Sequence, residues 1–187
     1  MDERFTEAWV NRDDWIVYGR RLHPFCLYDL FFLALDQNAA YFGDSPTQED
    51  LLAAVLVCSS KYEDLQAGRV SLKGFRRTYW MHKCKRVSFV QELLKFRAYL
   101  KDFDSRPQFW ESASGESMRA PALLSVATFL ELKTNMTESE IWTAPIGKMF
   151  WKSAAIAEIE GVTSSQIVTP DEAKFIDEME KEAQANG

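Results

Sequence analysis

Glycine, proline and histidine are scarce in this chain of 187 residues, which has eight glycines, six prolines and two histidines. Because glycine and proline are the main helix breakers, there are few places where a helix must end. Between these residues, apolar side chains recur every three or four positions rather than every second one, a spacing typical of helices. The sequence therefore predicts an all-α fold, a compact bundle of about six to eight helices.

A long hydrophobic run is also lacking. The longest apolar stretch, Leu22–Leu35, is interrupted by a histidine, a proline and an aspartate. A membrane-spanning helix needs about 20 predominantly apolar residues, so this stretch predicts a central core helix instead. The first residues, Met1–Arg4, lack the cationic start and the apolar region of a secretory signal. We therefore expect the protein in a cytoplasm.

Residues that commonly perform catalysis or bind metals are few and scattered. The three cysteines, Cys26, Cys58 and Cys84, lie far apart among apolar neighbours, as buried free thiols do. The two histidines, His23 and His82, are also expected to pack against apolar residues. No second pair of soft ligands accompanies His82 and Cys84, and no phosphate-binding loop or nucleophile elbow is present. We therefore expect no catalytic residue, no cofactor and no metal, and hence no enzyme.

Charge is distributed unevenly along the chain. Between Arg69 and Lys101 there are ten basic residues and one acidic residue, Glu92, although the whole chain has a net charge of -6. Such a block needs an anionic counterpart. The counterpart is an acidic part of the same fold, a partner subunit or a nucleic acid.

The basic block predicts two amphipathic helices that meet near Val87. In the second helix, apolar residues spaced by three or four define one buried face: Phe89, Leu93, Phe96, Leu100 and Phe103. The first helix carries a basic patch among aromatic residues, a mixture that can neutralise phosphates and stack bases: Arg76, Arg77, Lys83, Lys85 and Arg86. A nucleic-acid-binding regulator is therefore one alternative function. We favour an acidic protein surface as the counterpart, because the chain as a whole is acidic.

The stretch 105–121 separates two helical halves. It contains prolines, serines and a glycine, a composition that predicts a loop or a linker. The expected N-terminal half, 1–104, includes the basic helices, and the expected C-terminal half, 122–187, ends in an acidic helix. The two halves form either separate units or a single domain, 1–187.

Four cap patterns predict helix starts, each with a serine or threonine followed three residues later by an amide or an acid: Ser45 with Gln48, Ser88 with Gln91, Thr137 with Glu140, and Thr169 with Glu172. The first of these helices is expected to reach about Ser59. The last, from Pro170 to Ala183, is strongly acidic and has a narrow apolar stripe. It is the expected acidic counterpart of the basic block, either in the same chain or in a neighbouring one.

Several stretches of the chain together resemble a known family. They combine a histidine and proline before an apolar helix, a second apolar helix, a short helix with a tryptophan, and an aromatic-rich helix. The stretches are Leu22–Phe25, Gln48–Ser59, Met136–Trp142, Pro145, Met149–Gly161 and Thr169–Ala173. They resemble the tail assembly chaperones of tailed bacteriophages and prophages.

The resemblance implies a non-enzymatic helical protein of virion assembly. Such a chaperone coats the tape measure protein, keeps its long apolar helix soluble and recruits tail tube subunits. The candidate partner-binding residues are large apolar side chains of the aromatic region and the terminal helix: Trp142, Met149, Phe150, Trp151, Phe175, Ile176 and Met179. A structural virion protein of the head–tail or tail region is the alternative. We expect protein partners, a homo-oligomer as one option, and no membrane.

Overall fold

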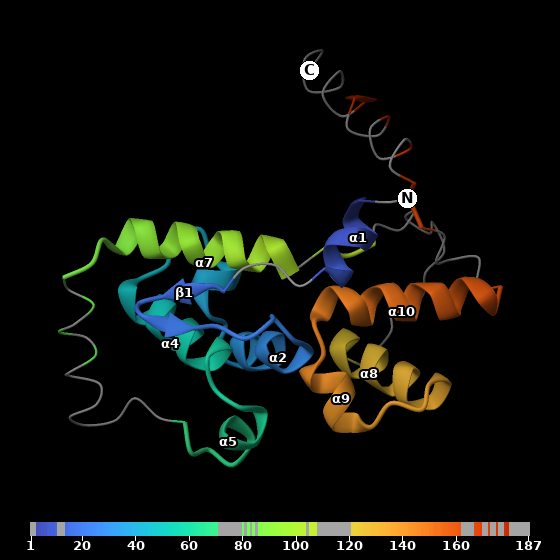
Figure 1. Cartoon of the computed structure of the whole chain (residues 1–187), viewed down its shortest axis with the longest axis horizontal. Helices are drawn as coiled ribbons and strands as arrows, with labels where there is room; N and C mark the ends of the chain where they lie inside the picture. Colours follow the sequence, from blue (N-terminus) through green and yellow to red (C-terminus); the bar gives the residue numbers. More distant parts are fainter. Residues whose placement is uncertain are drawn as a thin grey trace.

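The computed structural model describes residues 3–10, 14–70, 80, 82, 84, 86–103, 105–107, 121–161, 167–169, 172, 175, 178 and 179. Over these residues the fold is all-α with one small two-stranded sheet, which confirms the predicted fold class. Figure 1 shows an elongated molecule with α7 (Phe89–Phe103) towards one end and α10 (Ile146–Ile159) towards the other. In the part of the chain that the structure describes, no helix has the combined length and apolar character needed to cross a membrane.

The helices α2 (Leu27–Leu35), α3 (Ala39–Phe42) and α4 (Gln48–Cys58) pack together on the α7 side of the molecule, and α5 (Tyr62–Gln66) follows them. The sequence predicted a central core helix within Leu22–Leu35, and α2 is central on one side only. Leu27, Leu30 and Leu33 are buried in the core, whereas Phe31 and Leu35 are exposed. The exposed side of α2 contributes to the candidate site below.

The helix α4 begins later than its predicted cap. Thr47 is the N-cap: its hydroxyl accepts a hydrogen bond from the Asp50 backbone N–H at 3.2 Å, and the Asp50 carboxylate accepts one from the Thr47 N–H at 2.7 Å. The predicted cap at Ser45 is therefore wrong. A carboxylate three residues after Thr47 is a stronger acceptor than the amide of Gln48 three residues after Ser45, which favours the later start. The predicted end near Ser59 is confirmed.

A short ribbon of β1 (Ile16–Val17) and β2 (Arg20–Arg21) lies against α7. Its turn places Tyr18 and Gly19 at positive φ, 50° and 71°. The carboxylate of Glu92 on α7 accepts hydrogen bonds from the Tyr18 backbone N–H at 2.5 Å and from Lys95 Nζ at 2.6 Å. The single acidic residue of the basic block is thus buried and anchors the ribbon.

The predicted buried face of α7 is confirmed. Phe96 is fully buried, and the other members of the stripe pack against the core: Phe89, Leu93, Leu100 and Phe103. Glu92 and Tyr99 are buried as well, so the inward side of the helix is broader than the apolar spacing predicted.

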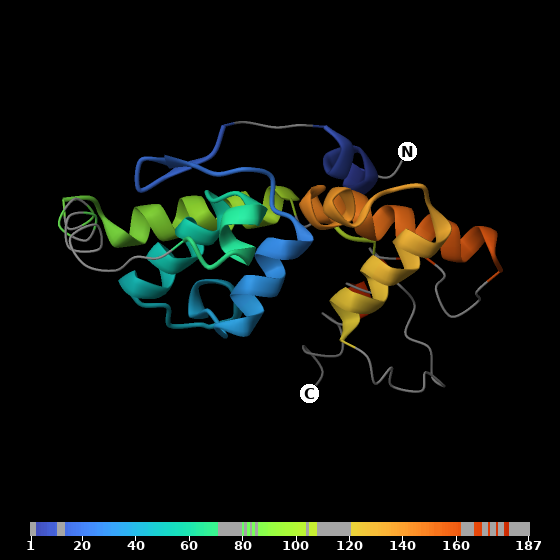
Figure 2. The same ribbon diagram turned by 90° about the horizontal axis from the view of Figure 1, so that it is seen from below.

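The helices α8 (Ala122–Lys133), α9 (Glu138–Thr143) and α10 pack together at the other end of the molecule. The capping box of Thr137 and Glu140 is present at the start of α9, as predicted. The helix α1 (Glu3–Trp9) lies near the junction of α7 and α10 in both views (Figures 1 and 2). Glycine is favoured at position 147, because a Cβ atom there would lie 3.1 Å from the Phe103 carbonyl oxygen, which is a tight contact.

One hydrophobic core extends through both ends of the molecule. The same cluster contains Leu33 and Leu52 from the N-terminal helices and Leu130 and Ile141 from the C-terminal helices. The backbone N–H of Ile146 also donates a hydrogen bond to the Phe25 carbonyl at 2.8 Å. The two predicted halves are therefore joined by packing and by hydrogen bonds, and the boundary at 105–121 stays a prediction.

Candidate functional site

An apolar groove opens between α2, α5, α8 and α9, with a volume of about 620 Å³. Both α2 and α8, drawn in blue and in yellow in Figure 2, contribute residues to its lining. Aromatic and aliphatic side chains form most of its lining: Tyr28, Phe31, Phe32, Ala34, Leu35, Tyr62, Pro121, Ala122, Leu123, Leu124 and Trp142. Besides the hydroxyls of Tyr28 and Tyr62, the described lining has two polar side chains, those of Gln66 and Glu138.

The spacing of α2 explains how this groove forms. Phe31 and Leu35 are four residues apart, so they lie on one face of the helix, 40% and 64% exposed. Trp142 of α9 contacts Phe31 edge to face, with 5.9 Å between the ring centroids. On the opposite side, Leu124 of α8 is 52% exposed. Large apolar side chains that are exposed and contiguous mark a binding surface more often than isolated ones do.

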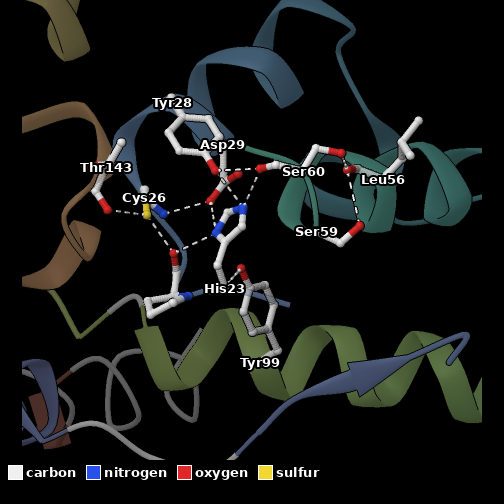
Figure 3. A network of polar contacts seen from close by, with 10 residues as sticks. His23, Cys26, Tyr28, Asp29, Leu56, Ser59, Ser60, Tyr99 and Thr143 are labelled. Carbon is white, nitrogen blue, oxygen red and sulfur yellow. Dashed lines mark hydrogen bonds and ion pairs between the residues drawn. The ribbon is translucent and has the colours of Figure 1, made fainter. Parts of the chain in front are cut away.

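A buried polar cluster lies beside the groove, where α2 begins (Figure 3). We call its four residues, His23, Cys26, Tyr28 and Asp29, the polar junction. The hydroxyl of Tyr28 lies 2.6 Å from His23 Nε2 and donates to the carbonyl of Ser60, after α4, at 2.9 Å.

The polar junction also contacts α7 and the end of α9. The hydroxyl of Tyr99 on α7 donates to the His23 carbonyl at 2.9 Å, and Cys26 Sγ lies 2.9 Å from the Thr143 carbonyl oxygen (Figure 3). Four helices that are distant in sequence therefore meet at the start of α2.

Asp29 is fully buried in the polar junction. Its Oδ2 accepts a hydrogen bond from the Cys26 backbone N–H at 2.9 Å and lies 3.5 Å from His23 Nδ1, whereas its Oδ1 has no hydrogen-bond partner among the described residues. Burial raises the pKa of Asp29 well above its usual value and lowers the pKa of His23. The loss of solvent thus favours the uncharged form of both side chains.

Within the described part of the chain, His23, Cys26 and Asp29 form one group whose potential metal-ligand atoms all lie within 4.8 Å of one another. Each already has protein contacts: the thiol lies 2.6 Å from the Pro24 carbonyl oxygen, the carboxylate caps α2, and the imidazole contacts Tyr28. Burial raises the pKa of the Cys26 thiol and so disfavours the thiolate that metal binding or nucleophilic chemistry needs. These contacts favour a structural role that holds helices together.

The candidate partner-binding residues of the sequence occupy three different environments. Trp142 lines the groove, and Phe175 and Met179 are 63% and 54% exposed. Met149 and Trp151 are buried in the core, where Trp151 Nε1 donates to the Ser105 carbonyl at 2.8 Å. Contact of these two side chains with a partner would require unpacking of the core.

The other predicted site residues are only partly described. Phe150 is half-buried beneath the guanidinium of Arg106, 4.8 Å from its ring centroid. Arg86 of the basic patch is exposed. The remaining predicted residues lie outside the described residues: Ile176, Arg76, Arg77, Lys83 and Lys85. The nucleic-acid alternative therefore stays a prediction.

The cysteine and histidine predictions have mixed outcomes. All three cysteines are buried thiols outside any disulfide, as predicted. His23 is packed in the polar junction, whereas His82 is exposed and the prediction of its burial is wrong. Among the described residues of that segment, Trp80 and Cys84 are buried instead.

Sequence reasoning did not find the groove residues of α2 and α8 or the polar junction. The sequence did contain one signal for the polar junction. His23, Cys26 and Asp29 are spaced by three residues, which places them on one side of a helix start. Neither a protein-family model, nor a curated protein, nor a solved structure matches this chain. The groove and its surroundings are therefore the main basis for a functional interpretation.

Proposed function

We propose that the protein is a non-enzymatic assembly factor that binds an apolar helical segment of another protein in the groove of α2, α5, α8 and α9. One observation carries the proposal: Phe31, Leu35 and Leu124 are exposed around a continuous apolar lining. An amphipathic helix binds such a groove with apolar side chains spaced by three and four residues. Its burial removes apolar surface of both partners from water.

The polarity of the lining favours a peptide helix over a small polar ligand. Small-molecule sites combine apolar walls with a few polar groups that fix the orientation of the ligand. Here the polar groups are the Gln66 amide, the Glu138 carboxylate and the hydroxyls of Tyr28 and Tyr62, and Tyr28 already donates to Ser60. Because Glu138 is acidic, a helix with neutral or basic flanks is the better occupant.

The particular role that we propose is that of a phage tail assembly chaperone. The resemblance of Leu22–Phe25 and Met136–Trp142 to that family supports this role, and both segments adjoin the groove or the polar junction. The occupant of the groove is then an apolar helix of the tape measure protein, and tail tube subunits are recruited to the complex. The protein acts in the host cytoplasm.

The test is co-expression with the tape measure protein of the same genome. The wild-type chain is expected to keep the tape measure protein soluble, and the groove variant L35E/L124E to leave it in the pellet. A matched control, L132E/I159E, places the same charges on leucine and isoleucine side chains that are 76% and 85% exposed outside the groove lining. The proposal is wrong if the groove variant solubilises the tape measure protein as well as the control does.

Mass spectrometry of purified particles distinguishes the alternative of a structural virion protein. A chaperone is absent from finished particles, because it leaves when the tail tube assembles. A structural protein is present in a fixed copy number. Detection at a constant ratio to the tail tube subunit would replace the chaperone role by the structural one.

A further inference from the structure

Among the described residues, one exposed face of α7 has an apolar half and a basic half. Val87, Val90 and Leu94 are 41%, 61% and 61% exposed, and Arg97 and Lys101 continue the same stripe at intervals of three and four residues. This face flanks the buried stripe of α7, about 110° around the helix axis from it. Arg97 and Lys101 form no ion pair with another described residue.

The acidic C-terminal segment carries a surface of the opposite charge. Its start is marked by a capping box, in which the Glu172 carboxylate accepts from the Thr169 backbone N–H at 2.8 Å. Beyond it, Phe175 and Met179 are four residues apart, helical and exposed, and Glu178 beside them is exposed as well. The sequence from Asp171 to Glu182 has six acidic residues against two lysines.

Charge decides between the two apolar surfaces that this segment could cover. The groove has Glu138 in its lining, which repels an acidic helix. The α7 face offers Arg97 and Lys101 beside its apolar half, so both the charge and the apolar stripe of the segment are complemented there. Figure 1 shows the described residues of the segment, in red, away from α7.

We propose that the C-terminal segment of one copy docks on the exposed face of α7 in a second copy. Phe175 and Met179 then cover Val90 and Leu94, and the acidic side chains of the segment lie near Arg97 and Lys101. This contact is heterologous, so repeated copies form a ring or an open chain. The proposal does not depend on the occupant of the groove, which stays open in every copy.

The test uses two charge-reversal variants of the full chain, studied by sedimentation velocity at low and high salt. R97E/K101E makes the α7 face acidic, and E178K/E182K makes the segment basic. We expect the wild type to associate, and its dissociation constant to rise at least tenfold in either variant and in high salt. Mixing the two variants is expected to restore association, because each face then meets a segment of opposite charge on the other chain.

The control K61E reverses a charge at the start of α5, outside α7, and is expected to associate like the wild type. Three outcomes would overturn the proposal. The first is a wild type that remains monomeric at all concentrations, as it would if the segment docked on its own chain. The second is association that is unchanged in both reversal variants. The third is a mixture of the variants that stays monomeric although each variant is folded by circular dichroism.

Discussion

The groove and the polar junction are neighbouring regions of α2 that use the same helix in opposite ways. In the polar junction, buried polar groups are connected to three other segments of the fold, whereas large apolar side chains of the groove stay exposed. Tyr28 belongs to both regions, since its ring lines the groove and its hydroxyl lies in the junction. We interpret the junction as the part that fixes the walls of the groove, and the groove as the surface at which the proposed partner binds.

The largest stability effect is expected from Asp29. The substitution D29A removes the buried acceptor of the Cys26 N–H and leaves this donor unsatisfied, at a cost of about 2 kcal/mol. The variant D29N keeps an acceptor in place, so its loss in the free energy of unfolding is expected to be less than half of the loss in D29A. Urea denaturation followed by circular dichroism measures both. Equal losses in the two variants would show that the hydrogen bond to Cys26 does not hold the junction.

A smaller effect on stability is expected from a substitution of Tyr28, the residue that the two regions share. The substitution Y28F removes the hydroxyl contacts with His23 and Ser60 but keeps the ring in the groove lining. We expect a loss of about 1 kcal/mol in the free energy of unfolding, with partner binding preserved. If binding fell while stability did not, the hydroxyl would belong to the groove rather than to the junction.

The pH dependence of stability distinguishes the contribution of His23 from that of Asp29. Burial lowers the folded-state pKa of His23, so below its unfolded value of about 6.5 the unfolded chain binds more protons. The stability provided by neutral His23 is therefore complete above that pH and falls as the pH decreases from there towards the folded-state pKa. The raised pKa of Asp29 acts in the opposite direction, because the folded chain then binds the extra proton.

Comparison of the wild type with H23Q isolates the histidine contribution, since Asp29 is present in both. Thermal denaturation at several pH values should show a steeper loss of stability on acidification in the wild type. Parallel curves would mean that His23 has the same pKa in the folded and unfolded states.

The smallest stability effect is expected in the groove. Leu35 is 64% exposed, so L35E should change the free energy of unfolding by no more than about 0.5 kcal/mol. Chemical denaturation of L35E alongside D29A checks this directly. A loss comparable to that of D29A would show that the groove side of α2 supports the fold, and it would remove the distinction between the two regions.

Local patterns in the sequence predicted local structure well. The capping box of Thr137 and Glu140 and the buried face of α7 were both correct, because each depends on residues within a few positions of one another. The Ser45 cap failed because Thr47 and Asp50 offered a competing pattern two residues later. The ribbon at Ile16–Val17 was missed because strands of two residues have no measurable alternation.

The candidate site was less accessible to sequence reasoning. Trp142 was predicted as a contact residue and does line the groove, but Phe31 and Leu35 were assigned to the core because α2 is apolar on nearly every side. Which side stays open depends on where α8 and α9 pack, and this is set by contacts between residues about 100 positions apart. Similarly, only the fold brings Thr143 to Cys26.

Hydroxyl-radical labelling of side chains in the free protein and in its complex with the tape measure protein tests the central claim most directly. The groove interpretation predicts that labelling of Phe31, Leu35 and Trp142 falls on complex formation, whereas Leu132 and Ile159, which are exposed outside the groove, are labelled as before. Unchanged labelling of the groove residues in a stable complex would contradict the claim that the partner binds there.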